Sequence, residues 1–206
     1  MINNYNDLKK FLETLETKPK LLLHACCGPC STHTINFLVK YFDVTVFYDN
    51  PNIDTLEEFN KRLEELKKVV TRFPNVKLIV NDYLPETFYK AIKGYERLGE
   101  FSQRCYNCMA LRMTNTYNYA EANDFEYYTT TLSISPYKNS EWINEIGYRL
   151  ASSGTPKFLY SNFKKDDGYK NSIRMSVEMA LYRQHYCGCR YSKEEYELKT
   201  NGTNQD

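Results

Sequence analysis

Apolar residues in the first eighty positions follow two spacings in turn. A spacing of three to four residues, typical of an amphipathic helix, occurs in three segments: 4–15, 31–41 and 54–69. Short apolar or β-branched runs, typical of buried strands, occur in three others: 21–25, 43–48 and 76–80. Pro29 suits the first turn of the second helix, and Asp54 is expected to cap the third. The remaining charges of the third helix are interpreted as a solvated face.

The second half of the chain continues this alternation. Helices are predicted over 85–98, 104–122, 142–151 and 172–184, and strands over 127–132 and 157–160. Because strands that alternate with helices pair in parallel, the sequence predicts an α/β fold with a parallel sheet flanked by helices. In such sheets, ligands bind beyond the carboxyl ends of the strands. No repeat or linker divides the chain, so residues 1–198 are interpreted as one domain and residues 199–206 as a polar, disordered tail.

Composition restricts the possible functions. The 27 Lys and Arg nearly balance the 26 Asp and Glu, and the net charge of +1 excludes a uniformly basic nucleic-acid-binding surface. No apolar run reaches the roughly 18 to 20 residues of a membrane span. The first ten residues lack the basic and then apolar layout of a signal peptide. A cytoplasmic protein without a membrane partner is therefore predicted.

Seven cysteines are the most informative part of the composition. They form three groups: Cys26, Cys27 and Cys30 in one turn, Cys105 and Cys108 at a predicted helix start, and Cys187 and Cys189 around Gly188. In a reducing compartment, clustered cysteines more often bind metal or perform redox chemistry than form structural disulfides. The last pair suits either a redox dithiol or an inert pair beneath a loop.

Thiolates of this kind bind both zinc and iron–sulfur centres, and their spacing leaves both open. Two features favour iron–sulfur chemistry. Cys26 and Cys27 are adjacent, unlike a regular zinc-binding pair, and they follow a strand where α/β proteins bind ligands. The predicted helix start near Cys105, together with Arg104 and Arg112, would also stabilise an anionic cluster.

Basic residues alternate with Tyr and Phe in segment 160–183, as in surfaces that bind RNA phosphates and stack bases. Asp166 and Asp167 dilute this charge. An ordinary surface loop and helix explains the segment more simply, so it predicts no partner by itself.

Five blocks, in this order along the chain, resemble the QueH family of epoxyqueuosine reductases. They are Leu23-His24-Ala25-Cys26-Cys27-Gly28-Pro29-Cys30-Ser31, Tyr48-Asp49-Asn50-Pro51-Asn52-Ile53, Arg104-Cys105-Tyr106-Asn107-Cys108 with Leu111-Arg112-Met113, Thr130 to Asn139, and Tyr186-Cys187-Gly188-Cys189-Arg190-Tyr191-Ser192. Together they span nearly all of the chain from Leu21 to Ser192. One such block is a weak signal, whereas five in order are specific.

The resemblance implies reduction of the epoxide of epoxyqueuosine to the cyclopentene of queuosine, the last step of queuosine biosynthesis in tRNA. It implies a [4Fe–4S] cluster with an additional iron ion, a tRNA carrying epoxyqueuosine at the wobble position, and an external electron donor. The fold that it implies is a nucleotide-hydrolase-like three-layer sandwich related to ATP-pyrophosphatase domains. The phosphate loop of those domains is replaced here by the 26–30 turn, which argues against ATP activation.

Site residues follow from the same resemblance. The expected metal ligands are Cys26, Cys27, Cys105 and Cys108. Cys30 is expected to be a further ligand, suited to the second iron, and is therefore also counted among the catalytic residues. Cys187 and Cys189 are expected to pass electrons as a dithiol, or to be structural. The expected substrate contacts are Asn50, Asn52, Tyr137 and Lys138, and Gly28 is expected to matter little. Two other functions stay open: a zinc-stabilised RNA-binding module and a thiol-dependent tRNA sulfur transferase.

Overall fold

The computed structural model describes residues 2–202. A single sheet of five parallel strands has the order β3-β2-β1-β4-β5. The strands are β1 (Lys20–His24), β2 (Asp43–Tyr48), β3 (Lys77–Val80), β4 (Tyr127–Thr130) and β5 (Lys157–Phe158). The central strands β1 and β2 are apolar because helices cover both faces of the sheet.

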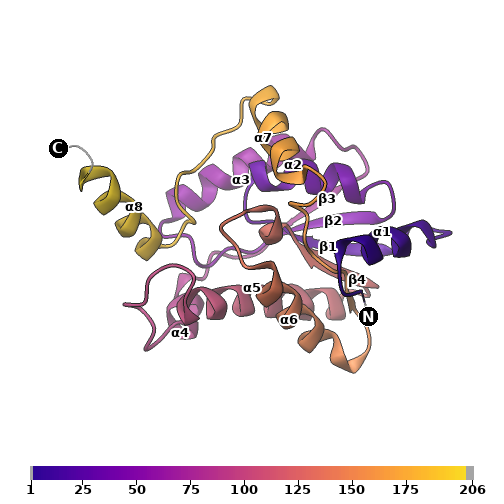
Figure 1. Cartoon of the computed structure of the whole chain (residues 1–206), viewed down its shortest axis with the longest axis horizontal. Coiled ribbons are helices and arrows are strands. Elements are labelled where there is room, and N and C mark those ends of the chain that lie inside the picture. Colours follow the sequence, from indigo (N-terminus) through magenta and orange to yellow (C-terminus); the bar gives the residue numbers. More distant parts are fainter. Residues whose placement is uncertain (1, 203–206) are drawn as a thin grey trace.

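Helices form a layer on each face of the sheet (Figure 1). One layer holds α1 (Tyr5–Glu13), α2 (Gly28–Leu38), α3 (Leu56–Val70) and α7 (Gly168–Glu178). The other holds α4 (Pro85–Ala91), α5 (Gln103–Ala122) and α6 (Ser140–Leu150). Along β1, Leu21 and Leu23 pack into the first layer and Leu22 into the second, as the two-residue period of a strand requires. The predicted α/β fold, a parallel sheet flanked by helices in three layers, is therefore confirmed.

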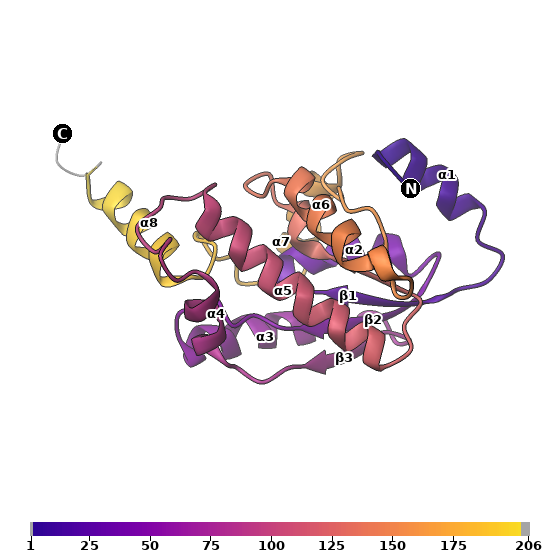
Figure 2. The same ribbon diagram turned by 90° about the horizontal axis from the view of Figure 1, so that it is seen from below.

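Two short 3₁₀ helices and a last helix complete the chain: η1 (Thr131–Ile134), η2 (Ala151–Ser153) and α8 (Arg190–Gly202). Seen from below, α5 crosses the strands and its first turn lies at the end of the molecule that carries α8 (Figure 2). Helix α8 has no counterpart among the elements predicted from the sequence. Residues 199–202 of the expected disordered tail belong to this helix, and residues 203–206 lie outside the described part of the chain.

Several predicted boundaries were wrong. The helix predicted over 85–98 ends at Ala91, and Gly94 continues the chain at a φ of +87°. The helix predicted over 172–184 is α7, which ends earlier because Ala180 takes a left-handed conformation and the Leu181 N–H closes on the Ser176 carbonyl at 2.9 Å. The strand predicted over 127–132 gives way at Thr131 to the 3₁₀ turn.

Two expectations about single residues were also wrong. Thr55, rather than Asp54, caps α3, and its hydroxyl oxygen accepts the Glu58 N–H at 3.2 Å. Gly28 does matter, because a Cβ there would lie 2.7 Å from the Glu65 carbonyl oxygen of α3. The absence of a side chain at Gly28 thus lets α2 approach α3 closely and fixes where the 26–30 turn lies.

Among the helices of residues 2–202, none combines the length and the apolar character that a membrane span requires.

Candidate metal and redox site

The site lies where the strand order reverses, between β1 and β4. Ligands of open parallel sheets bind at this point, beyond the carboxyl ends of the strands. Cys26 follows β1 and Thr131 follows β4. The Cys26 N–H donates to the Thr131 hydroxyl at 3.2 Å, and that hydroxyl lies 3.5 Å from the Cys26 sulfur. The two strand ends are therefore joined directly at the first cysteine.

Cys26, Cys27 and Cys30 form a compact thiol trio at the start of α2. Their three sulfurs all lie within 4.8 Å of one another, and Pro29 starts the helix that holds them. Hydrogen bonds from the Cys27 and Cys30 thiols hold the pKa of Cys26 well below its usual value, against the effect of burial. The hydrogen bond to Cys26 raises the pKa of Cys27 to about 12. One thiolate shared among three close sulfurs is a donor set suited to a soft metal ion.

The other four cysteines meet around a small cavity next to the thiol trio. Cys105 and Cys108 lie in the first two turns of α5, and Cys187 and Cys189 lie in the loop before α8. All four line this cavity together with Lys138. Burial raises the pKa of the Cys108 thiol to about 12. All seven cysteines are free thiols. The three groups seen in the sequence thus converge on one end of the sheet.

A larger pocket of about 300 Å³ opens above the thiol trio. Cys26, Cys30 and Cys187 line it, so Cys187 borders both cavities. The pocket walls also include Tyr137, Lys138, Arg183, His185, Tyr196 and Lys199.

Three arginines of this pocket each keep a buried N–H group without a hydrogen-bond partner in residues 2–202. These groups are Arg62 Nη2, Arg112 Nε and Arg183 Nη1. Arg62 and Arg112 are each only 2% exposed. The interpretation of the 54–72 charges as a solvated face was therefore wrong for Arg62, which turns inward and donates to the Cys187 carbonyl at 3.0 Å. Arg62 also forms an ion pair with Glu58 at 2.7 Å, so the unpaired groups are single N–H donors, and such donors at a pocket wall favour an anionic ligand.

Arg112 connects the cysteine groups electrostatically. Burial opposes its charge, but the electrostatic influence of the Cys108, Cys26 and Cys187 sulfurs favours it, and the pKa of Arg112 is raised. Its Nη2 donates to the Asn50 side-chain oxygen at 2.5 Å, and Asn50 donates in turn to the Ala25 carbonyl at 2.9 Å. Asn50 therefore holds Arg112 against the loop that leads to Cys26.

The four expected substrate contacts lie in different surroundings. Asn50 is buried and does not line the large pocket, and Asn52 borders the small cavity. Tyr137 is 69% exposed and lines the large pocket beside Lys138. Contact of these residues with a substrate stays a prediction.

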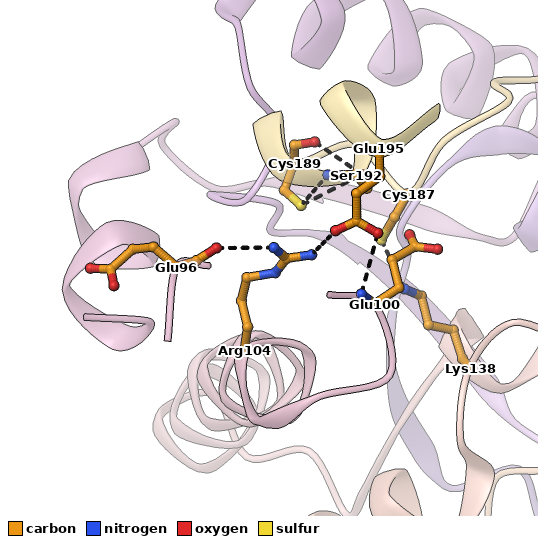
Figure 3. A network of polar contacts seen from close by, with 8 residues as sticks. All are labelled: Glu96, Glu100, Arg104, Lys138, Cys187, Cys189, Ser192 and Glu195. Carbon is orange, nitrogen blue, oxygen red and sulfur yellow. Dashed lines mark hydrogen bonds and ion pairs between the residues drawn. The ribbon is translucent and has the colours of Figure 1, made fainter. Parts of the chain in front are cut away.

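A polar network that the sequence analysis missed attaches α8 to the site (Figure 3). Arg104, at the start of α5, forms an ion pair with Glu195 of α8 at 2.7 Å and donates to the Glu96 carbonyl at 3.1 Å. The backbone N–H of Glu100 also donates to Glu195, at 3.3 Å. Glu195 and Tyr196 then form part of the pocket wall. The sequence held two signals for this helix. Arg190 and Glu194 are four residues apart and can pair on a helix, and no Gly or Pro occurs from there to Gly202.

The fold and the site together define a class: an α/β protein with a thiol-rich site at the switch point of a parallel sheet. The family model described as "Epoxyqueuosine reductase QueH" matches residues 21–195. The chain belongs to this family, and the resemblance given above is confirmed. It is thereby placed among the oxidoreductases.

Individual relatives agree with the family model. A Streptococcus pyogenes protein named "Epoxyqueuosine reductase QueH" is 36% identical over 190 residues, which cover 90% of this chain and 74% of that protein. A Thermotoga maritima protein of the same name is 38% identical over 175 residues, covering 84% and 89% respectively. A Staphylococcus epidermidis protein, also so named, is 34% identical and covers 100% of this chain and 90% of its own length.

A solved structure supports the fold. The U34-tRNA thiolase NcsA from Methanococcus maripaludis, solved with its [4Fe–4S] cluster, matches 94% of this chain and 70% of its own with a TM-score of 0.53. The sequence identity is 13%, so the likeness concerns the fold alone.

Proposed function

We propose that this protein reduces the epoxide of epoxyqueuosine to the alkene of queuosine in tRNA, as a cytoplasmic enzyme. The carrying observation is the thiol trio beneath a pocket of about 300 Å³, with three sulfurs within 4.8 Å of one another. The names of the relatives support the reaction, and the pocket supplies a place for a nucleoside above soft metal ligands.

The thiol trio, whose sulfurs lie within 4.8 Å of one another, supports an iron–sulfur centre. In this proposal Cys26, Cys27, Cys105 and Cys108 hold a [4Fe–4S] cluster, and Cys30 binds an additional iron ion. Soft thiolates suit such centres, and the buried charge of Arg112 near Cys26 and Cys108 stabilises their negative charge. When bound there, the cluster would supply electrons and the iron ion would supply Lewis acidity for opening the epoxide.

The protein side chains of the pocket bind and orient the tRNA. The unpaired N–H groups of Arg62 and Arg183 are donors for a phosphate oxygen of the RNA backbone. Tyr137 is exposed at the pocket wall, where its ring stacks on a base of the anticodon loop. Asn50 acts by holding Arg112, and Asn52 borders the cavity shared by the last two cysteine pairs. Although its net charge is only +1, the chain thus recognises RNA through a local group of cations.

Electrons enter through Cys187 and Cys189, which act as a dithiol that an external donor reloads. Cys187 borders both the substrate pocket and the cavity lined by Cys105 and Cys108. This position at both cavities supports a role in passing electrons toward the proposed metal ligands.

Anaerobic reaction of the iron-loaded protein with tRNA carrying epoxyqueuosine and a strong reductant tests the proposal. Nucleoside mass analysis should show the loss of one oxygen atom. Cys26→Ser should lose visible absorbance and activity, whereas Arg174→Ala, which changes an exposed ion pair on α7 and does not line the pocket, should keep both. An intact cluster without turnover contradicts the reaction. Stoichiometric zinc without iron indicates the RNA-binding module instead, and gain of sulfur by the tRNA indicates a sulfur transferase.

A further inference from the structure

Lys138 makes a direct contact with one sulfur of the Cys187 and Cys189 pair. Its ammonium nitrogen lies 2.8 Å from the Cys187 sulfur, which is hydrogen-bonding distance (Figure 3). The backbone of Lys138 is held on both sides, since its N–H donates to the Ser135 carbonyl at 3.3 Å and its carbonyl accepts from Lys164 at 3.2 Å. The contact therefore comes from a fixed turn after η1, and not from a freely moving surface lysine.

The two sulfurs of the pair have different surroundings. Cys187 is partly exposed and lines the large pocket, whereas Cys189 is 8% exposed and does not line it. The Cys189 sulfur lies 3.4 Å from the Ser192 N–H and 3.5 Å from the Ser192 hydroxyl. Between them, Gly188 has a φ of +125°, and a Cβ there would lie 2.7 Å from Arg62 Nη1. The loop therefore holds one sulfur open to the pocket and the other covered.

We propose that Lys138 is a positioning residue that holds Cys187 as a thiolate and makes it the reactive sulfur of the pair, while Cys189 is the resolving sulfur. This inference rests on the proposed redox role of the pair. A thiolate is the nucleophilic form of cysteine, and a neighbouring ammonium group stabilises it. The same ammonium stabilises Cys187 again whenever it is released from a disulfide.

The other cations around Cys187 act in the same direction as Lys138, and one of the two carboxylates that line the pocket is already paired. Arg62 and Arg112 are the other cations that favour its thiolate form. Cys108, Cys105 and Cys189 are the neighbouring thiols. The carboxylate of Glu195 is paired with Arg104, and Glu100 lines the same cavities. Burial acts to raise the pKa of Cys187, but the charge and hydrogen bond of Lys138, with the two arginines, outweigh it and the pKa is lowered.

The reducing step balances with an external dithiol as the reductant. One thiolate of the dithiol attacks the Cys187 sulfur of the oxidised pair, the S–S bond breaks, and Cys189 leaves with the electron pair and takes up a proton. The second thiol of the dithiol loses its proton and attacks the sulfur of the first, which displaces Cys187 as a thiolate beside Lys138. Two electrons pass to the pair, and the dithiol becomes a disulfide.

Alkylation of the full-length, anaerobically purified protein by iodoacetamide tests this assignment. Peptide mass analysis over time gives separate rates for Cys187 and Cys189, and no turnover assay is needed. We expect Cys187 to react at least about tenfold faster at pH 7, because only its thiolate is stabilised. Lys138→Met should slow Cys187 by roughly tenfold and move the midpoint of its pH profile upward. Lys138→Arg should restore the rate, and Lys165→Met, a neighbouring change of equal charge, should leave it unaltered.

Faster alkylation of Cys189 than of Cys187 in the unmodified protein overturns the inference, whatever the variants do. An unshifted pH profile in folded Lys138→Met overturns the role of Lys138. These results are separate from the proposed function. A protein that reduces epoxyqueuosine but alkylates first at Cys189 contradicts only the inference. One in which Cys187 reacts first but the epoxide is not reduced contradicts only the proposed function.

Discussion

Replacing Glu195 by alanine should release α8 from the site. The change leaves the Arg104 guanidinium, whose side chain is 4% exposed, without its carboxylate at 2.7 Å, while Glu195 itself is 29% exposed. Removing one partner of a fully buried pair costs about 3–5 kcal/mol, and an exposed pair contributes about 0–1 kcal/mol. A pair of intermediate exposure should therefore cost about 2 kcal/mol. Because the Glu100 N–H also loses its acceptor, the loss should fall on α8 itself.

Hydrogen exchange of the α8 amides measures this loss directly, because exchange of a terminal helix reports its local opening. A cost of about 2 kcal/mol corresponds to exchange on the order of 30-fold faster. Glu194→Ala is a matched control on the same helix. Glu194 pairs with Arg190, and the two side chains are 50% and 63% exposed. Loss of this exposed ion pair should change the exchange of α8 by less than about twofold. Equal acceleration of α8 exchange by both changes would refute the role given to the Arg104–Glu195 pair.

Three further changes test other parts of the structure. Gly28→Ala should lower the free energy of unfolding by about 1–3 kcal/mol in urea titrations, because the new Cβ would lie 2.7 Å from a backbone oxygen of α3. Gly99→Ala is the control and should leave this free energy unchanged, because a Cβ there has nothing within 4 Å. Arg183→Ala should raise KM for the tRNA several-fold with unchanged melting temperature, and Arg174→Ala should change neither. Cys105→Ala should remove the visible absorbance of the iron-loaded protein, and an unchanged spectrum would exclude Cys105 as a ligand.

The central fold could be predicted because its residues obey local rules. Residues 43–48 are almost entirely apolar or β-branched, and the structure has β2 at these positions. Boundaries were wrong where backbone conformation, rather than periodicity, ends an element. Ala180 ends α7 in a left-handed conformation, which is uncommon for alanine and has no sequence signal. The last helix was missed because its apolar residues show no strong amphipathic pattern, and contacts with α5 hold it.

The candidate site also contains a part that local sequence predicts and a part that depends on long-range packing. The thiol trio could be predicted, because all three cysteines occur within one turn after an apolar run. The place of Arg62 in the pocket could not, because its sequence context matches an exposed helix face rich in Glu and Lys. Its burial depends on the loop around Gly188, more than a hundred positions later, which covers it and accepts its N–H. Long-range packing of this kind leaves no periodic trace in either segment.

The net charge of +1 conceals a strongly uneven distribution, and this decides how the site works. Lys138 contacts the Cys187 sulfur, Arg62 and Arg112 act on it electrostatically, and both arginines keep an N–H group without a partner in the described residues. Burying cations costs free energy unless anions offset it. Glu58 offsets part of this cost at Arg62 through an ion pair at 2.7 Å, and thiolates, bound anionic groups or RNA phosphate supply the remainder. The pocket is thus organised for negative charge on both its floor and its walls, which is the requirement shared by a thiolate-bound metal centre and a tRNA substrate.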